Sequence, residues 1–209
     1  MIAESLLTGL LSMGNPMPGA VISAPEILAP IEERVEAVRK APADPRARLE
    51  LGMAYAEAEE YEFALSELVE AIRLNPENRD NLSARANFEL GNVLFAIDRI
   101  VLAADAYREA LRLGWETPEV HIALAQALSG QGKLEEAVAQ YREALTLSPE
   151  AFEAHVGLAL ALESLGRVEE AAGHYERSLQ SVGAGPQADD HGIVAIKQRL
   201  ARLKERQKM

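Results

Sequence analysis

The chain has no cysteine among its 209 residues, which excludes disulfide bonds, thiolate catalysis and cysteine-ligated metal sites. Aromatic residues make up only 5% of the sequence, although 48% of it is hydrophobic. Alanine and leucine dominate, and valine, isoleucine and threonine rarely form the alternating runs that strands need. The composition therefore predicts an all-α protein with enough apolar side chains for a core.

Positive charge is scarce as well, because the formal net charge is −12. A protein that follows the phosphates of a nucleic acid needs a coherent basic face, so we expect no nucleic-acid partner. The C-terminus differs, since residues 191–209 carry six Lys or Arg and one Glu. We interpret these charges as the solvated face of a terminal helix, in preference to a site for acidic partners.

No hydrophobic run approaches the length of about 20 residues that a membrane span needs, so we expect no membrane partner. The apolar stretch "IAESLLTGLLSM" (2–13) contains Glu4 and no preceding Lys or Arg, which is not typical of a secretory signal. We therefore expect a soluble, cytoplasmic protein. A helix this short is marginal alone, so we favour docking of some kind, either back on the groove or with a second copy, with disorder as the alternative.

Similar stretches recur 34 residues apart. Glu135-Glu136, Ala137 and Tyr141 return as Glu169-Glu170, Ala171 and Tyr175. A larger side chain where two helices cross would overpack the contact by about 1–3 kcal/mol, so regularly spaced small residues predict close helix crossings. These small residues are Ala64, Ala103, Ala137 and Ala171, followed by Ala71, Ala110, Ala144 and Ser178.

The period resembles that of the tetratricopeptide repeat family, whose units are helix–turn–helix pairs of 34 residues with small residues at fixed points. The first helices carry the resemblance in "LELGMAY" (49–55), "FELGNVL" (88–94), "IALAQAL" (122–128) and "VGLALAL" (156–162), and Pro76 and Pro149 close two units. The resemblance implies a right-handed α-solenoid of helix-turn-helix repeats, a tetratricopeptide-like superhelix with terminal capping helices.

The repeats divide the chain into four regions. Asp44-Pro45 and Thr117-Pro118 predict the starts of two first helices, and the insertion 79–83 predicts an early helix start or a bulged loop. The regions are an apolar segment with a Gly/Pro-rich linker (1–23), a half repeat (24–44), four repeats within 45–185 (45–78, 84–117, 118–151 and 152–185), and a capping helix with a basic face (186–209).

The resemblance also implies a concave wall of first helices that holds a peptide or a helix from a partner. The face beside the Leu-Gly positions, read at helical spacing, has an apolar stripe with acidic residues next to it, which suits an amphipathic ligand with basic flanks. Amide side chains on this face suit a ligand backbone. The predicted groove residues are Leu49, Met53, Phe88, Asn92, Phe95, Ile122, Gln126, Val156 and Leu160, with ordinary packing or solvation an equal alternative for each.

We find no pattern that predicts an enzyme, a cofactor or a metal site. His121 and His155 are repeat-equivalent, which favours a shared structural role, and His174 is expected among exposed residues of a second helix. None of the four histidines has a catalytic or metal-ligand partner at a recognisable spacing. The "GQGK" stretch (130–133) is too short for a phosphate-binding loop.

The sequence therefore favours a non-enzymatic scaffold or adaptor that binds a protein or peptide partner in its groove. The alternative is a homo-oligomeric assembly subunit whose copies join through the N-terminal helix and the groove. The motifs specify a fold and a mode of binding, and they do not specify the partner.

Overall fold

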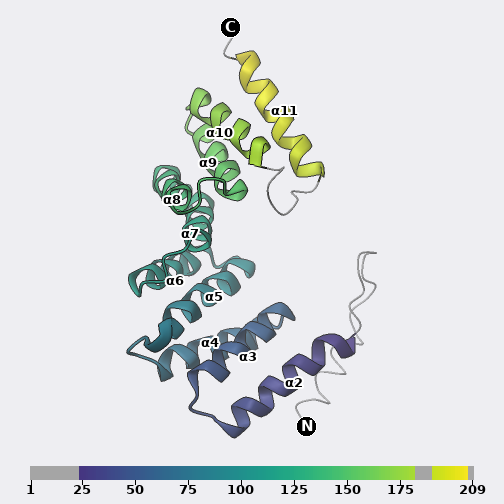
Figure 1. Ribbon diagram of the computed structural model, residues 1–209, viewed down its shortest axis with the longest axis vertical. Coiled ribbons are helices and arrows are strands. Elements are labelled where there is room, and N and C mark those ends of the chain that lie inside the picture. The colour runs from purple at the N-terminus through teal and green to yellow at the C-terminus, as the bar shows by residue number, and fades with distance from the viewer. Residues whose placement is uncertain (1–23, 182–189, 207–209) are drawn as a thin grey trace.

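The computed structural model describes residues 24–181 and 190–206, and these residues form helices with no strand (Figure 1). The predicted N-terminal segment 1–23 and residues 182–189 and 207–209 lie outside them. The elements are α2 (Ala24–Lys40), α3 (Pro45–Glu57), α4 (Tyr61–Leu74), the 3-10 turn η1 (Arg79–Asn81), α5 (Leu82–Ala96), α6 (Ile100–Arg112), α7 (Pro118–Gly130), α8 (Leu134–Leu147), α9 (Phe152–Ser164), α10 (Val168–Ser181) and α11 (Asp190–Arg206).

Antiparallel helix pairs stack along the chain to form an all-α helical repeat fold, as predicted. Each first helix (α3, α5, α7, α9) packs most extensively on the second helix that follows it (α4, α6, α8, α10). Each second helix then packs on the first helix of the next pair, while α2 covers α3 and α11 covers α10. Because every unit contacts only its neighbours, the helices trace an extended arc from α2 to α11 (Figure 1).

Two first helices begin where the sequence predicted. Pro45 and Pro118 open α3 and α7, where the fixed φ of proline suits the first turn. Asp44 Oδ1 accepts a hydrogen bond from the Arg46 backbone N at 2.9 Å and so caps α3. Thr117 is extended before α7, but its side chain makes no capping hydrogen bond.

Close helix crossings depend on small side chains. The eight small positions predicted on the second helices are at most 3% exposed. Glycine has the same purpose at two contacts of the first helices: a Cβ on Gly91 would lie 2.4 Å from Tyr107 Cε1, and one on Gly157 would lie 2.3 Å from Tyr141 Cζ. These distances are too short for any side chain unless the tyrosine ring moves.

The insertion between the first two repeats forms a short turn. The turn η1 occupies part of it, and α5 begins at Leu82. Asn78 holds this turn against the neighbouring repeat, because its Nδ2 donates to Leu113 O at 2.9 Å and its Oδ1 accepts from the Ala84 backbone N at 2.9 Å. The buried core divides one helix later, between α5 and α6, into one cluster that runs from Ile31 to Val93 and another that runs from Ala103 to Leu203.

Helix α11 closes the C-terminal end of the array. Ile196 and Leu203 are at most 5% exposed and belong to the second core cluster. Two of the basic residues on this helix make ion pairs, Arg199 with Glu163 at 3.1 Å and Lys204 with Glu176 at 2.6 Å. Part of the basic character of this helix is therefore used to attach the cap to the last repeat.

Within residues 24–181 and 190–206, no helix combines the length and the apolar character that crossing a membrane requires.

Candidate interaction groove

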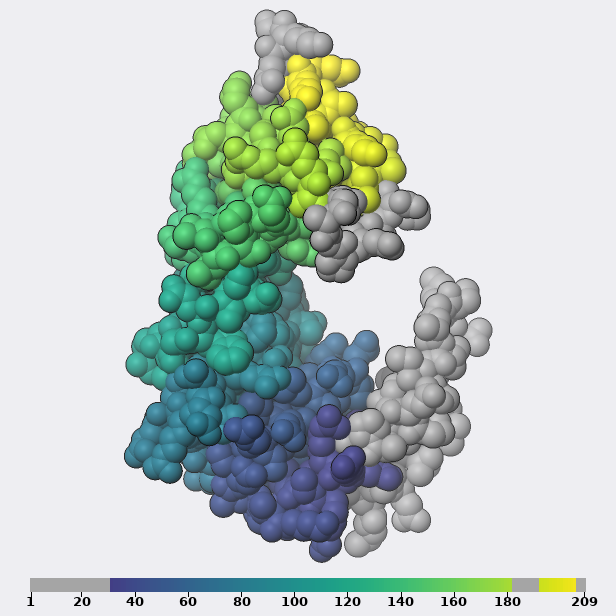
Figure 2. Space-filling view, viewed as in Figure 1, coloured from purple at the N-terminus to yellow at the C-terminus, as the bar shows by residue number. Residues whose placement is uncertain are grey.

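The first helices form the inner wall of the arc. They pack on one another along the array, since α3 contacts α5, α5 contacts α7 and α7 contacts α9. The structure shows no comparable contacts between the successive second helices α4, α6, α8 and α10. A row of helix pairs that is closer on one side curves toward that side, and Figure 2 shows the hollow that results between the N-terminal repeats and α11.

Leu49 is a correction to the predicted groove. Its side chain is 1% exposed and lies in the same core cluster as Ile31 and Val38 of α2. The helix α2 packs on α3 and contributes to the core around Leu49, so this residue has no surface left for a ligand. Leu49 therefore belongs to the core between α2 and α3.

The other predicted residues keep some exposed surface. Phe95 and Leu160 have the most among the apolar ones, with 36% and 38% of each residue exposed. The remaining apolar residues of the predicted stripe are half-buried and pack on the core with part of each side chain. They are Met53, Phe88, Ile122 and Val156.

Asn92 takes part in a polar network within its own repeat. Tyr107 Oη donates to Asn92 Oδ1 at 2.9 Å, and Asn92 Nδ2 donates to Glu89 Oε2 at 3.2 Å. The Phe88 ring lies beside that of Tyr107, with 5.9 Å between the ring centroids. The amide oxygen of Asn92 is thus engaged, whereas Gln126 is exposed and makes no hydrogen bond to the described residues.

Burial at this network raises the pKa of the Glu89 carboxyl, although its hydrogen bond from Asn92 and the charge of Arg85 oppose that effect. Burial and the nearby Glu89 carboxylate also raise the pKa of the Tyr107 hydroxyl. Tyr107 is therefore a neutral hydrogen-bond donor at physiological pH. It fixes the orientation of Asn92 in the wall.

A second network lies at the C-terminal end of the array. Glu163 Oε2 accepts hydrogen bonds from Tyr175 Oη at 2.8 Å and from Arg199 Nη1 at 3.1 Å. It joins α9, α10 and α11 through one carboxylate. Our sequence reasoning placed Glu89 and Glu163 on the inner face as acidic neighbours of the apolar stripe, but it did not include them or Tyr107 among the groove residues. The 34-residue spacing of Tyr107, Tyr141 and Tyr175 was the signal that could have directed attention to Tyr107.

The wall carries more acidic than basic side chains. Glu50, Glu119 and Glu153 occupy the predicted inner face and are exposed. On the same face, Arg46 lies 3.7 Å from Asp80 and has its charge partly neutralised. The wall therefore presents apolar surface bordered by carboxylates, which complements an amphipathic ligand with basic groups.

The histidines lie at contacts between first and second helices. His121 Nδ1 lies 2.8 Å from Gln140 Oε1, and His155 Nδ1 lies 3.0 Å from His174 Nδ1. His174 is half-buried against His155, in contrast to the exposed position expected for it. The side chain of His191 lies outside the described residues. Over the described part of the chain, no group of three or more His, Asp or Glu side chains is arranged to hold a metal ion.

Comparison with known families agrees with this architecture. A family model described as tetratricopeptide repeat matches residues 35–79, 64–118 and 122–189. A search of curated proteins finds no match.

Solved structures of low sequence identity share the fold. YrrB, described as a tetratricopeptide repeat protein with an unusual peptide-binding site, is 19% identical, with 85% of each chain covered and a TM-score of 0.71. A MamA fragment from Desulfovibrio magneticus RS-1 is 18% identical, with 89% of this chain and 96% of that chain covered and a TM-score of 0.68. The Cut9–Hcn1 complex is 16% identical, with 88% of this chain and 34% of that chain covered and a TM-score of 0.69.

Proposed function

Because this chain belongs to the tetratricopeptide repeat family, we propose that it is an interaction scaffold that binds an amphipathic peptide or helix along its inner wall. Proteins of this family are generally interaction modules and not enzymes. One observation carries the proposal: the wall of first helices holds an apolar row in which two side chains, Phe95 and Leu160, remain more than a third exposed. The peptide-binding site ascribed to YrrB gives it independent support.

The magnitude of the apolar contribution follows from this exposure. Full burial of a Phe or Leu side chain contributes about 1.5–3 kcal/mol, and roughly a third of each residue remains exposed here. Covering each of them therefore contributes about 0.5–1 kcal/mol, or roughly two- to fivefold in affinity. Several such contacts and the bordering carboxylates are needed together, so the ligand must follow the wall over more than one repeat.

Selection from a library of random peptides displayed on phage tests this proposal. We expect the selected peptides to have apolar residues at i, i+3, i+4 and i+7 spacing, together with Lys or Arg, and to bind more weakly at high salt. The double variant Phe95→Ser/Leu160→Ser should bind them about four- to twenty-fivefold more weakly. The control Val101→Ser/Leu102→Ser removes similar exposed side chains from α6, a second helix, and should leave the affinity unchanged.

Equal losses of peptide affinity in the two double variants would refute binding in the groove.

Solution mass, measured by sedimentation equilibrium, separates the scaffold from the self-assembling subunit that the sequence also allowed. The scaffold predicts a monomer at all concentrations, whereas the assembly subunit predicts association that is lost when residues 1–23 are deleted.

A further inference from the structure

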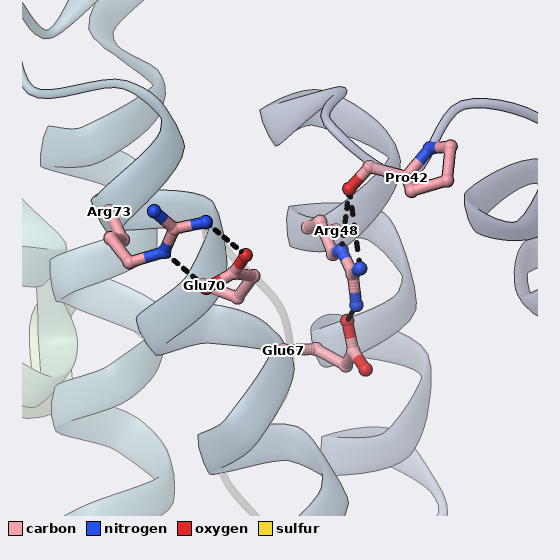
Figure 3. Close-up of polar contacts among 5 residues, drawn as sticks. All are labelled: Pro42, Arg48, Glu67, Glu70 and Arg73. Carbon is pink, nitrogen blue, oxygen red and sulfur yellow. Dashed lines mark hydrogen bonds and ion pairs between the residues drawn. The ribbon is translucent and has the colours of Figure 1, made fainter.

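In the first, third and fourth repeats, a side chain near the start of the first helix contacts the residue 19 positions later on the second helix. The first repeat shows the arrangement completely (Figure 3). Arg48 Nη1 donates to Glu67 Oε2 at 2.6 Å, while its Nε and Nη2 each lie 3.2 Å from Pro42 O. One turn further along α4, Arg73 makes two hydrogen bonds of 2.7 Å to Glu70. We call these four side chains and the Pro42 carbonyl the frame of the repeat, and both of its arginines are paired with a glutamate.

The fourth repeat builds the same frame 107 residues later with different side chains. His155 replaces Arg48, and its Nε2 donates to Pro149 O at 2.9 Å, as Arg48 donates to Pro42 O. His174 stands where the first repeat has Glu67. Two further changes remove the second ion pair, because Arg177 replaces Glu70 and Gln180 replaces Arg73.

The change at Arg177 reverses a charge that the other repeats share. The equivalent residues are Glu70, Glu109 and Glu143, and the first two of them pair with an arginine three residues later. Arg177 is exposed and makes no ion pair with any residue described in the structure. The fourth repeat therefore has an uncompensated cation at a position where its siblings have an anion.

These substitutions surround a pocket of about 570 Å³ between α8 and α10. Arg142 of α8 also lines it, and its charge is only partly compensated, since its Nη2 lies 3.2 Å from Glu170 Oε2 while Glu170 also pairs with Arg167 at 2.7 Å. The lining contains one carboxylate, Glu150. The other lining residues are Leu145, Thr146, Pro149, His155, His174, Arg177 and Gln180.

The hydrogen bonds fix which ring nitrogens carry protons. Pro149 O can only accept, so His155 Nε2 carries a hydrogen and the neutral ring leaves Nδ1 as an acceptor. His174 Nδ1 must then be the donor in the 3.0 Å contact between the rings. This assignment leaves His174 Nε2, for which the described residues provide no partner, as a lone pair that gains a donor hydrogen if the ring is protonated.

The electrostatic environment decides between an anion and a cation as the ligand. Burial lowers the pKa of His174 to about 4, and the charges of His155, Arg177 and Arg142 act in the same direction, with Glu170 opposing them. Burial also lowers the pKa of His155, to which Arg177 contributes. Burial disfavours any charge, but the charges of Arg177 and Arg142 repel a metal cation specifically, although the two imidazole nitrogens are close enough to chelate one.

We propose that this pocket binds a doubly charged tetrahedral oxyanion between Arg142, Arg177 and His174, either as a free phosphate ion or as the phosphoryl group of a phosphorylated side chain. Guanidinium groups from two helices supply the forked donors that such an anion prefers. His174 supplies a third donor through Nε2 once it takes up a proton. The site lies on the second-helix side of the repeats and shares no residue with the proposed groove.

Binding of the anion is coupled to a proton. The charged and titratable groups around His174 are Arg177 and Glu170 on α10, Arg142 on α8 and His155 on α9. Glu150, before α9, acts on His155. A bound dianion outweighs the arginine charges and raises the pKa of His174. Protonation then occurs on binding, so the affinity rises as the pH falls from 7 toward the pKa of the free ring.

Titration of the full-length protein with sodium sulfate, followed by the imidazole NMR signals, tests the proposal, because sulfate stays a dianion across this pH range. We expect saturable shifts of His155 and His174 and tighter binding at pH 5.5 than at pH 7. Arg177→Glu restores the residue of the other three repeats, so it should fold and bind at least about tenfold more weakly. Arg202→Glu changes the net charge equally on an exposed part of α11 and should bind as the unaltered protein does.

A second variant tests whether His174 takes up a proton when the anion binds. His174→Gln copies Gln140 of the third repeat, so the helix contact is retained. This variant should keep sulfate binding at pH 7 and lose the gain in affinity at pH 5.5. A gain that persists in His174→Gln would overturn the role given to His174.

Three results would overturn the site itself: no saturable shift, equal losses in Arg177→Glu and Arg202→Glu, or saturable binding of Zn²⁺ at pH 7 without binding of sulfate. Inorganic phosphate and O-phosphoserine with blocked ends identify the source of the anion. Equal affinity for the two supports a free ion, and tighter binding of blocked phosphoserine supports a phosphorylated side chain.

Discussion

Tyr141 occupies a space between helices that exists because Gly157 has no side chain. A Cβ at residue 157 would lie 2.3 Å from Tyr141 Cζ and 2.5 Å from its Oη. The ring is 3% exposed, so it has no open path to solvent. We predict that Gly157→Ala destabilises the array, although alanine is the better helix former.

Repeat symmetry indicates how the ring could be accommodated. The equivalent Tyr107 lies against Gly91 of its own repeat, and the position equivalent to Gly157 in the next repeat is the larger Ala123. Tyr141 has the reverse arrangement, with Ala125 in its own repeat and Gly157 in the next. Each of these two rings therefore has one glycine beside it, and Gly157→Ala removes the only one available to Tyr141.

Two opposing contributions to the free energy of unfolding set the size of this effect. Replacing a glycine inside a helix by alanine gains about 1 kcal/mol, and overpacking costs about 1–3 kcal/mol. Gly173→Ala is the matched control, because no atom lies within 4 Å of the position of its Cβ and only the gain applies. The two variants should differ by about 1–3 kcal/mol, which is about 2–4 °C in melting temperature for each kcal/mol in a chain of this size.

Thermal and urea unfolding followed by circular dichroism measure this difference. Midpoints are the quantity to compare, since repeat arrays depart from two-state unfolding. The double variant Ala125→Gly/Gly157→Ala copies the arrangement around Tyr107, so Gly157→Ala should cost little in that background. If Gly157→Ala is as stable as Gly173→Ala, or if Ala125→Gly does not suppress its effect, the reasoning is refuted.

Two further predictions concern polar contacts. Arg48→Met should destabilise the first repeat by about 1–3 kcal/mol, because it leaves Glu67 and Pro42 O without their donor in a partly buried site. Arg73→Met breaks an exposed pair and should cost much less. Urea midpoints distinguish the two variants, and equal effects would contradict the importance of burial. Glu89→Gln should stabilise the protein at pH 7, because burial raises the folded-state pKa of Glu89 above its ordinary value of 4.5 and makes its charged form unfavourable in the folded protein. The gain in stability should shrink as the pH falls through this raised pKa, because the carboxylate then becomes neutral. A gain that does not change with pH would refute the explanation.

The sequence by itself determined the helical repeat. Spacing of 34 residues, small residues at the crossings and prolines at Pro45 and Pro118 were enough to predict the helix pairs and two of their starts. These features are local, or they repeat at a fixed interval, so their physical consequences are readable along the chain. The helical spacing of Ile193, Ile196, Leu200 and Leu203 in the C-terminal cap is readable in the same way, and Ile196 and Leu203 are buried.

The tertiary structure decided which side chains remain available to a ligand. Leu49 has the spacing of a groove residue but is buried in the core that α2 completes, and Asn92 has its amide oxygen occupied by Tyr107. The pairing of His155 with His174 and the pocket beside Arg177 likewise depend on how α8, α9 and α10 stack. A repeat period reports what each unit has in common with the others. Exposure and charge compensation depend on the neighbours that packing brings to each unit, and these differ between repeats.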